Sequence, residues 1–215
     1  MLKIVSVLLI LAAFVSSCST PRPQGATEAE VLFKEANRLK EKGRYLLAIE
    51  RLNTIRSKYP YSYYSTHAEL LNADILFEQE NYAEAAAAYI VFRDFHPKHK
   101  ERSYVLYRVA ESFYYQLPDT FDRDLSPGYF KTDVYDAAKF RYKLILDNFS
   151  DSELRQHSIS RLLQSTAKLG ELKICKNYYS KFKAEANDNT VEEMDSALDQ
   201  CKTQKSINDS KEEES

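Results

Sequence analysis

Residues 36–60 read ANRLKEKGRYLLAIERLNTIRSKYP, and residues 73–97 repeat the same pattern 37 positions further along the chain. The matched positions hold small, aromatic and branched residues in the same order: Ala36, Gly43, Tyr45, Ala48, Leu52, Ile55 and Pro60, then Ala73, Glu80, Tyr82, Ala85, Tyr89, Phe92 and Pro97. A fixed period in this range is typical of solenoids, in which stacked helical repeats bury a continuous core. Solenoids bind other molecules along extended surfaces, so the period favours a binding function over catalysis.

Two further copies follow. Ala110 lies 37 residues after Ala73, but the rest of the third copy lies 53 residues after its counterparts: Tyr135, Ala138, Tyr142, Ile145 and Ser150. The difference of 16 residues predicts one insertion, at about residues 116–132. A fourth copy comes after another 37 residues: Gly170, Leu172, Cys175, Tyr179 and Phe182.

Each copy reads as a helix, a tight turn and a second helix. Only 4 glycines and 6 prolines interrupt the chain, which favours an all-α fold. The pattern resembles the tetratricopeptide repeat, although its usual Trp is missing and its usual period is about 34 residues. We predict an all-α, right-handed α-solenoid of about four tetratricopeptide-like helix pairs over residues 28–202, with a capping helix from Thr190 to about Lys202. Capping-box spellings at Thr27, Thr66 and Thr190 predict three helix starts.

The two ends of the chain lie outside this solenoid. The apolar run from Ile4 to Val15 is shorter than the roughly 20 residues of a membrane span, so residues 1–17 are predicted to be a signal peptide. The run ends in Val-Ser-Ser before Cys18, which looks like a bacterial lipobox and implies acylation of Cys18. Residues 18–27 then form a flexible tether. Residues 203–215, rich in Ser, Lys and Glu, are predicted to be a disordered tail.

The net charge indicates which partners the protein can bind, and the cysteines indicate whether it can form a disulfide. The net charge of −2 leaves no basic excess for phosphate contacts, so we expect no nucleic-acid partner. An extracytoplasmic location permits a disulfide between Cys175 and Cys201. Two separate buried thiols are the alternative.

The first helices of the repeats are expected to line a concave groove. Their phase predicts nine groove residues: Phe33, Asn37, Lys40, Leu70, Asp74, Phe77, Tyr107, Glu111 and Tyr114. This mixture of rings, amides and acids suits an extended peptide. Alternatively, several of the rings pack between repeats.

No motif in the chain predicts an enzyme. Asp119, Asp122 and Asp124 with Arg123 are better explained as ion pairs and caps of the insertion than as acid–base groups. His96 and His99 have no third ligand nearby in sequence, so we predict no metal site. Phosphate-binding glycine loops and nucleophile motifs are absent from the sequence, and no cofactor is expected.

The combination of features resembles the BamD (YfiO) family of outer-membrane assembly lipoproteins. The resemblance rests on the lipobox, on the spellings Tyr45-x-x-Ala48 and Tyr82-x-x-Ala85, and on an Asp122-Arg123-Asp124 segment in the third-repeat insertion. It implies a non-catalytic, lipid-anchored protein on the periplasmic side of the outer membrane. Such a protein docks on the periplasmic domains of a β-barrel insertase and binds unfolded outer-membrane protein segments.

One departure from the family and three alternatives remain. The family usually has five repeats, whereas only the capping helix follows Phe182 here, so no residue is assigned to insertase docking. Other periplasmic tetratricopeptide lipoproteins share the repeats: a pilotin, a Tol-associated cell-division factor, or a regulator of a cell-wall hydrolase.

Overall fold

The computed structural model of the chain describes residues 27–116, 132–148 and 152–213. Within these ranges the chain forms nine helices and no strand. They are α2 (Glu28–Glu41), α3 (Tyr45–Lys58), α4 (Tyr63–Glu78), α5 (Tyr82–Phe95), α6 (Arg102–Tyr115), α7 (Thr132–Asn148), α8 (Ser152–Lys168), α9 (Leu172–Phe182) and α10 (Asp188–Glu213). In this part of the chain, no helix is both long enough and apolar enough to cross a membrane.

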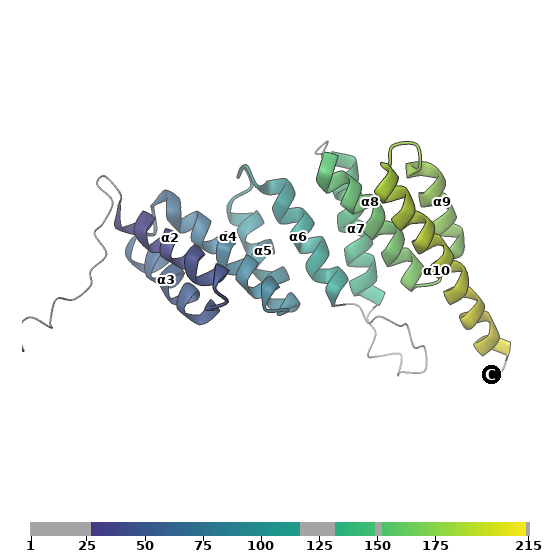
Figure 1. Cartoon of the computed structure of the whole chain (residues 1–215), viewed down its shortest axis with the longest axis horizontal. Coiled ribbons are helices and arrows are strands. Elements are labelled where there is room, and N and C mark those ends of the chain that lie inside the picture. The colour runs from purple at the N-terminus through teal and green to yellow at the C-terminus, as the bar shows by residue number, and fades with distance from the viewer. Residues whose placement is uncertain (1–26, 117–131, 149–151, 214–215) are drawn as a thin grey trace, which may run out of the picture.

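The helices stack side by side along the long axis of the molecule, with α2 and α3 at one end and α9 and α10 at the other (Figure 1). Each of the helices from α2 to α9 packs on the next one in the chain, and α10 packs on both α8 and α9. This arrangement confirms the predicted all-α solenoid of four helix pairs and a final capping helix.

Small residues allow the two helices of a pair to approach closely. The alanines at the repeated positions are all fully buried: Ala36, Ala48, Ala73, Ala85, Ala110 and Ala138. Large residues of the second helices fill the space against the next pair, and Leu52, Tyr89 and Tyr142 are also fully buried. The period therefore identified the core correctly.

The turn inside a repeat needs a residue in the left-handed region. Gly43 and Gly170 both have φ of +67°, and Glu80 occupies the same place with φ of 62°. In each turn the following residue donates its N–H to the carbonyl five positions earlier: Arg44 to Leu39, Asn81 to Leu76 and Glu171 to Thr166. A side chain is strained in this conformation, whereas glycine is not.

Helix starts were predicted less well than the core. The Thr27 hydroxyl accepts the Glu30 N–H at 3.2 Å, so the first capping prediction is confirmed. The prediction at Thr66 is wrong, because α4 already begins after Ser62, whose hydroxyl accepts the Ser65 N–H. The prediction at Thr190 is also wrong, since Asn187 Oδ1 accepts the Thr190 N–H at 2.9 Å and α10 begins at Asp188.

The capping helix is longer than expected. It continues to Glu213, through residues that the composition predicted to be a disordered tail. No Gly or Pro interrupts residues 203–213, and Lys205 Nζ lies 2.8 Å from Asp209 one turn further on.

The structure also joins Cys175 of α9 to Cys201 of α10 by a disulfide, with Cα atoms 6.8 Å apart. That bond fastens the capping helix to the last repeat.

Replacing Glu80 by glycine should stabilise the protein. Glu80→Gly removes the strain of a side chain in the left-handed region, but glycine also gives the unfolded chain more conformational entropy. The net effect should raise the free energy of unfolding by about 0.5–1 kcal/mol. Urea unfolding followed by circular dichroism measures the change. Gln79→Gly is the matched control, because Gln79 has φ of −82°; it should destabilise. A loss of stability in Glu80→Gly would contradict the strain argument.

Candidate binding groove

Four of the nine predicted groove residues lie around one cavity. Phe33 and Asn37 come from α2, and Leu70 and Asp74 from α4; together they line a space of about 280 Å³. Leu71 of α4 also lines this space, and α6 and the turn before it supply the remaining residues. The cavity therefore lies among the first helices of three successive repeats.

Four further polar or aromatic residues of this cavity were missed by the sequence analysis: His67, Lys100, Glu101 and Tyr104. His67 and Tyr104 are 37 residues apart, so they hold the same place in consecutive repeats, one turn before the predicted positions. The period itself could have identified them. Lys100 and Glu101 come from the turn before α6, whose path the period does not predict.

The cavity combines aromatic walls with a charged rim. The Phe33 ring lies 5.6 Å from the Tyr64 ring and 6.1 Å from the His67 ring, measured between centroids. The side chain of Lys100 is 68% exposed, with its nearest carboxylate, that of Glu101, 3.7 Å away. Apolar groups of a ligand could contact the rings while a ligand carboxylate meets Lys100.

The other five predicted groove residues lie elsewhere. Lys40 is paired with Glu78 at 2.5 Å, and Phe77 lies under the Arg108 guanidinium. Tyr107 is half-buried near the rings of Tyr142 and His157. Glu111 and Tyr114 are only 4% and 8% exposed, because α7 and α8 cover this side of α6. These five side chains belong to contacts within and between repeats.

Asp74 is the centre of a partly buried polar network. The hydroxyls of Tyr89 and Tyr104 both donate to its Oδ1, at 2.5 and 2.8 Å. Arg108 Nε donates to the Tyr89 hydroxyl at 3.2 Å, and its guanidinium lies 3.7 Å from the centre of the Phe77 ring. Burial raises the pKa of Asp74, although the two tyrosine hydroxyls and Arg108 oppose this shift.

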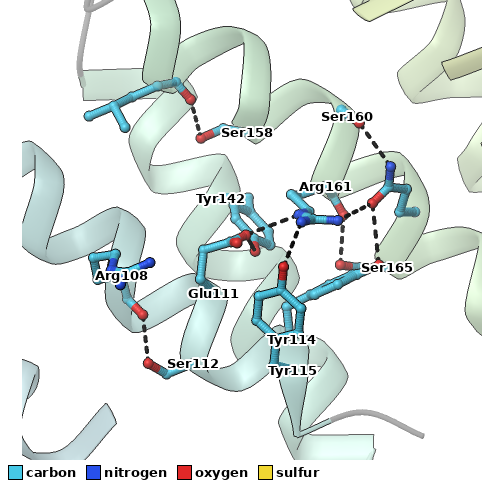
Figure 2. Close-up of polar contacts among 12 residues, drawn as sticks. Arg108, Glu111, Ser112, Tyr114, Tyr115, Tyr142, Ser158, Ser160, Arg161 and Ser165 are labelled. Atoms are coloured by element: carbon cyan, nitrogen blue, oxygen red, sulfur yellow. Dashed lines mark hydrogen bonds and ion pairs between the residues drawn. The ribbon is translucent and has the colours of Figure 1, made fainter. Parts of the chain in front are cut away.

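Glu111 is the centre of a second network, shown in Figure 2. The Tyr142 hydroxyl donates to Glu111 Oε1 at 2.5 Å, and Arg161 Nε donates to the same oxygen at 3.1 Å. Arg161 also donates to the Tyr115 hydroxyl at 2.9 Å and lies 4.6 Å from the centre of the Tyr114 ring. Burial alone would lower the pKa of Arg161, but the Glu111 carboxylate raises it above the usual value.

The two networks are copies of each other. Asp74 and Glu111 are 37 residues apart, while Tyr89 and Tyr142, like Arg108 and Arg161, are 53 apart because of the insertion. Each network joins an acid on the first helix of a repeat, a tyrosine on its second helix and an arginine on the next repeat. We call these acid–tyrosine–arginine contacts the junction networks. The corresponding residues of the first repeat boundary are Asn37, Leu52 and Leu71, so that boundary is largely apolar.

The histidines of the turn before α6 are engaged within the protein. His96 Nε2 lies 2.9 Å from Glu69 Oε2. The His99 ring lies 5.4 Å from the His67 ring, and burial together with His67 lowers the pKa of His99. Across the described ranges, no group of three or more His, Cys, Asp or Glu side chains is arranged to hold a metal ion.

The predicted lipidation site Cys18 and the insertion residues Asp122, Arg123 and Asp124 lie outside the described residues.

The fold and the cavity define a helical-repeat protein suited to binding, and comparison with known proteins narrows this class. The family model described as YfiO, outer membrane lipoprotein, matches residues 25–128. The outer membrane protein assembly factor BamD of Rickettsia prowazekii is 26% identical over 136 residues, which make up 62% of this chain and 54% of that relative. BamD of Vibrio cholerae serotype O1 is 25% identical over 171 residues, 76% of this chain and 69% of that relative.

These matches confirm that the chain resembles the BamD (YfiO) family of outer-membrane lipoproteins. The matched part of the chain spans about half of the length of the Rickettsia relative and about two thirds of the length of the Vibrio relative.

Breaking the second junction network should strongly destabilise the solenoid. Arg161→Met leaves the nearly buried Glu111 carboxylate without its cation and should lower the free energy of unfolding by about 3 kcal/mol. The double variant Glu111→Gln with Arg161→Met should cost less than the two single changes added together, because it leaves no unpaired charge at the junction. Chemical unfolding of all four proteins measures this coupling.

The exposed Lys202–Asp199 pair provides the control, since its side chains are 52% and 75% exposed. Lys202→Met should change the free energy of unfolding by less than about 1 kcal/mol. Strict additivity of the Glu111 and Arg161 changes would show that the network does not stabilise the junction.

Proposed function

We propose that this protein is a component of the outer-membrane β-barrel assembly machinery. In this role it is a non-catalytic scaffold that docks on the periplasmic domains of the barrel insertase and binds unfolded outer-membrane protein segments. The observation that carries the proposal is the family match at residues 25–128, a range that contains every residue lining the cavity between Phe33 and Tyr104. The names of both relatives, outer membrane protein assembly factor, support the same role.

The location follows from the same proposal. Acylation of Cys18 would hold the solenoid on the periplasmic side of the outer membrane, with residues 18–27 as the tether. The several acyl chains of a bacterial lipoprotein anchor a soluble body firmly, whereas a single chain binds only marginally.

Affinity capture from detergent-solubilised membranes tests the role. The full chain carries a tag after Ser215, and co-purifying proteins are identified by mass spectrometry. We expect a β-barrel insertase with periplasmic domains as the main partner. Recovery of a secretin, a Tol component or a cell-wall hydrolase in its place would refute the assembly role and favour one of the other repeat lipoproteins.

The cavity is proposed to receive the segments of the unfolded substrate. Lys100 on its rim is placed to meet the terminal carboxylate of a peptide taken from the C-terminal end of an outer-membrane protein. Lys100→Glu should therefore weaken binding of such a peptide about fivefold at low salt, as expected for reversing one partly exposed charge. Fluorescence anisotropy with a labelled peptide measures the affinity.

Lys98→Glu is the matched control, because Lys98 is exposed in the same turn but does not line the cavity. It makes the same change in net charge and should leave the affinity nearly unchanged. If both substitutions weakened peptide binding equally, the affinity would depend on the overall charge of the protein. That result would contradict the assignment of the cavity as the peptide site.

A further inference from the structure

The second helix of the last repeat, α9, has a strongly basic surface. Residues 172–184 contain Lys173, Lys176, Lys181 and Lys183 and no Asp or Glu. All four lysines are exposed. Lys181 lies over the Phe182 ring, and Lys183 donates to the Tyr179 hydroxyl, so these two are engaged locally. Among the described residues, neither Lys173 nor Lys176 is within ion-pair distance of a carboxylate.

Lys173 and Lys176 border a shallow apolar depression. The depression has a volume of about 600 Å³ and is lined by Gly170, Glu171, Leu172, Lys173, Ile174, Lys176 and Lys205. Leu172 and Ile174 supply its apolar part, and Ile174 is 38% exposed. We call Leu172, Lys173, Ile174 and Lys176 the α9 patch.

The charges next to the α9 patch are already balanced. Glu171 is paired with Lys139 of α7 at 2.8 Å, and Lys205 of α10 is paired with Asp209 at 2.8 Å. The positive charge that remains at the depression therefore comes from Lys173 and Lys176. Both project from the same helix as the exposed Ile174.

This combination fits a membrane surface better than an acidic protein. Lysines attract anionic headgroups, and their flexible stems let the ammonium groups reach the phosphates while neighbouring apolar side chains enter the boundary with the acyl chains. The exposed Ile174 would gain nothing from an acidic partner that contacts only the lysines, whereas Leu172 packs partly against the core. We propose that the α9 patch binds the anionic phospholipid surface of the membrane that carries the protein.

The α9 patch and the N-terminal end of the fold lie at opposite ends of the solenoid. The chain enters the fold at α2, and α9 lies at the other end (Figure 1). An acylated N-terminus and the α9 patch would thus attach the two ends of an elongated body to one surface. Two such attachments reinforce each other, because the second becomes intramolecular once the first has formed. The solenoid would then lie along the membrane.

Vesicle flotation tests the proposal with the chain from residue 18 to 215 carrying Cys18→Ser, so that no acyl chain contributes. The protein is mixed with vesicles of phosphatidylethanolamine and phosphatidylcholine, with or without phosphatidylglycerol. We expect binding only to the anionic vesicles, and its loss in high salt. Lys173→Gln with Lys176→Gln should reduce the partition constant about 25-fold, or about fivefold for each lysine.

Two further variants make the test specific. Lys42→Gln with Lys58→Gln removes two exposed lysines at the other end of the solenoid and should leave binding within about twofold of the parent. Ile174→Ser removes the exposed apolar contact without changing the charge, and should also weaken binding. The proposal would be overturned if both double lysine variants lost the same amount of vesicle binding, or if binding did not depend on phosphatidylglycerol.

A protein partner at this patch would give a different result. In that case the Lys173 and Lys176 variant would lose a protein in the affinity capture, while none of the chains would float with anionic vesicles; this outcome also overturns the proposal. The flotation assay contains only this chain and lipid. Its failure therefore leaves the assembly role untouched, and failure to capture an insertase leaves the membrane contact untouched.

Discussion

A buried carboxylate between two repeats is the constraint on which the packing of this solenoid depends. Glu111 is only 4% exposed, and such a charge is strongly destabilising unless hydrogen bonds and a cation compensate for the lost water. Tyr142 and Arg161 supply both, and they come from two different helices. The network can form only when α6, α7 and α8 are correctly placed, so it specifies the register of one repeat on the next. The partly buried Asp74 imposes a similar condition on α4, α5 and α6, because Tyr89 donates to it and Arg108 donates to Tyr89.

The fold was largely predictable because close helix packing requires small residues at fixed positions. A period of 37 residues could be read from alanines that all prove to be fully buried, and the insertion was visible as a shift of that period. Helix ends depend instead on competition between local signals. Ser62 follows Pro60 closely and starts α4 before Thr66 can act as a cap. The tail was misjudged because low hydrophobicity excludes a core but does not prevent a helix from continuing in the absence of Gly or Pro.

The candidate site was only partly predictable. The helical phase placed Phe33, Asn37, Leu70 and Asp74 on one cavity. It could not distinguish a free first-helix surface from one covered by later helices, and so Glu111 and Tyr114 were assigned to the groove although α7 and α8 bury them. The junction networks were missed for another reason. The repeat was read from its small and apolar positions, whereas Arg108 and Arg161 obey the same spacing as charged residues.

The position of the cavity follows from the difference between the repeat boundaries. Asp74 belongs both to the cavity wall and to a junction network, and Tyr104 of the same wall donates to it, so the α4 and α6 side of the cavity is held by hydrogen bonds. The rest of the lining includes Phe33 and Asn37 of α2, which belong to the first boundary, where Leu52 and Leu71 replace the tyrosine and the arginine. Apolar contacts are less directional than hydrogen bonds and leave more freedom to adjust. A ligand would thus meet one preorganised wall and one adaptable wall, which lowers the entropy lost on binding while different sequences can still be accommodated.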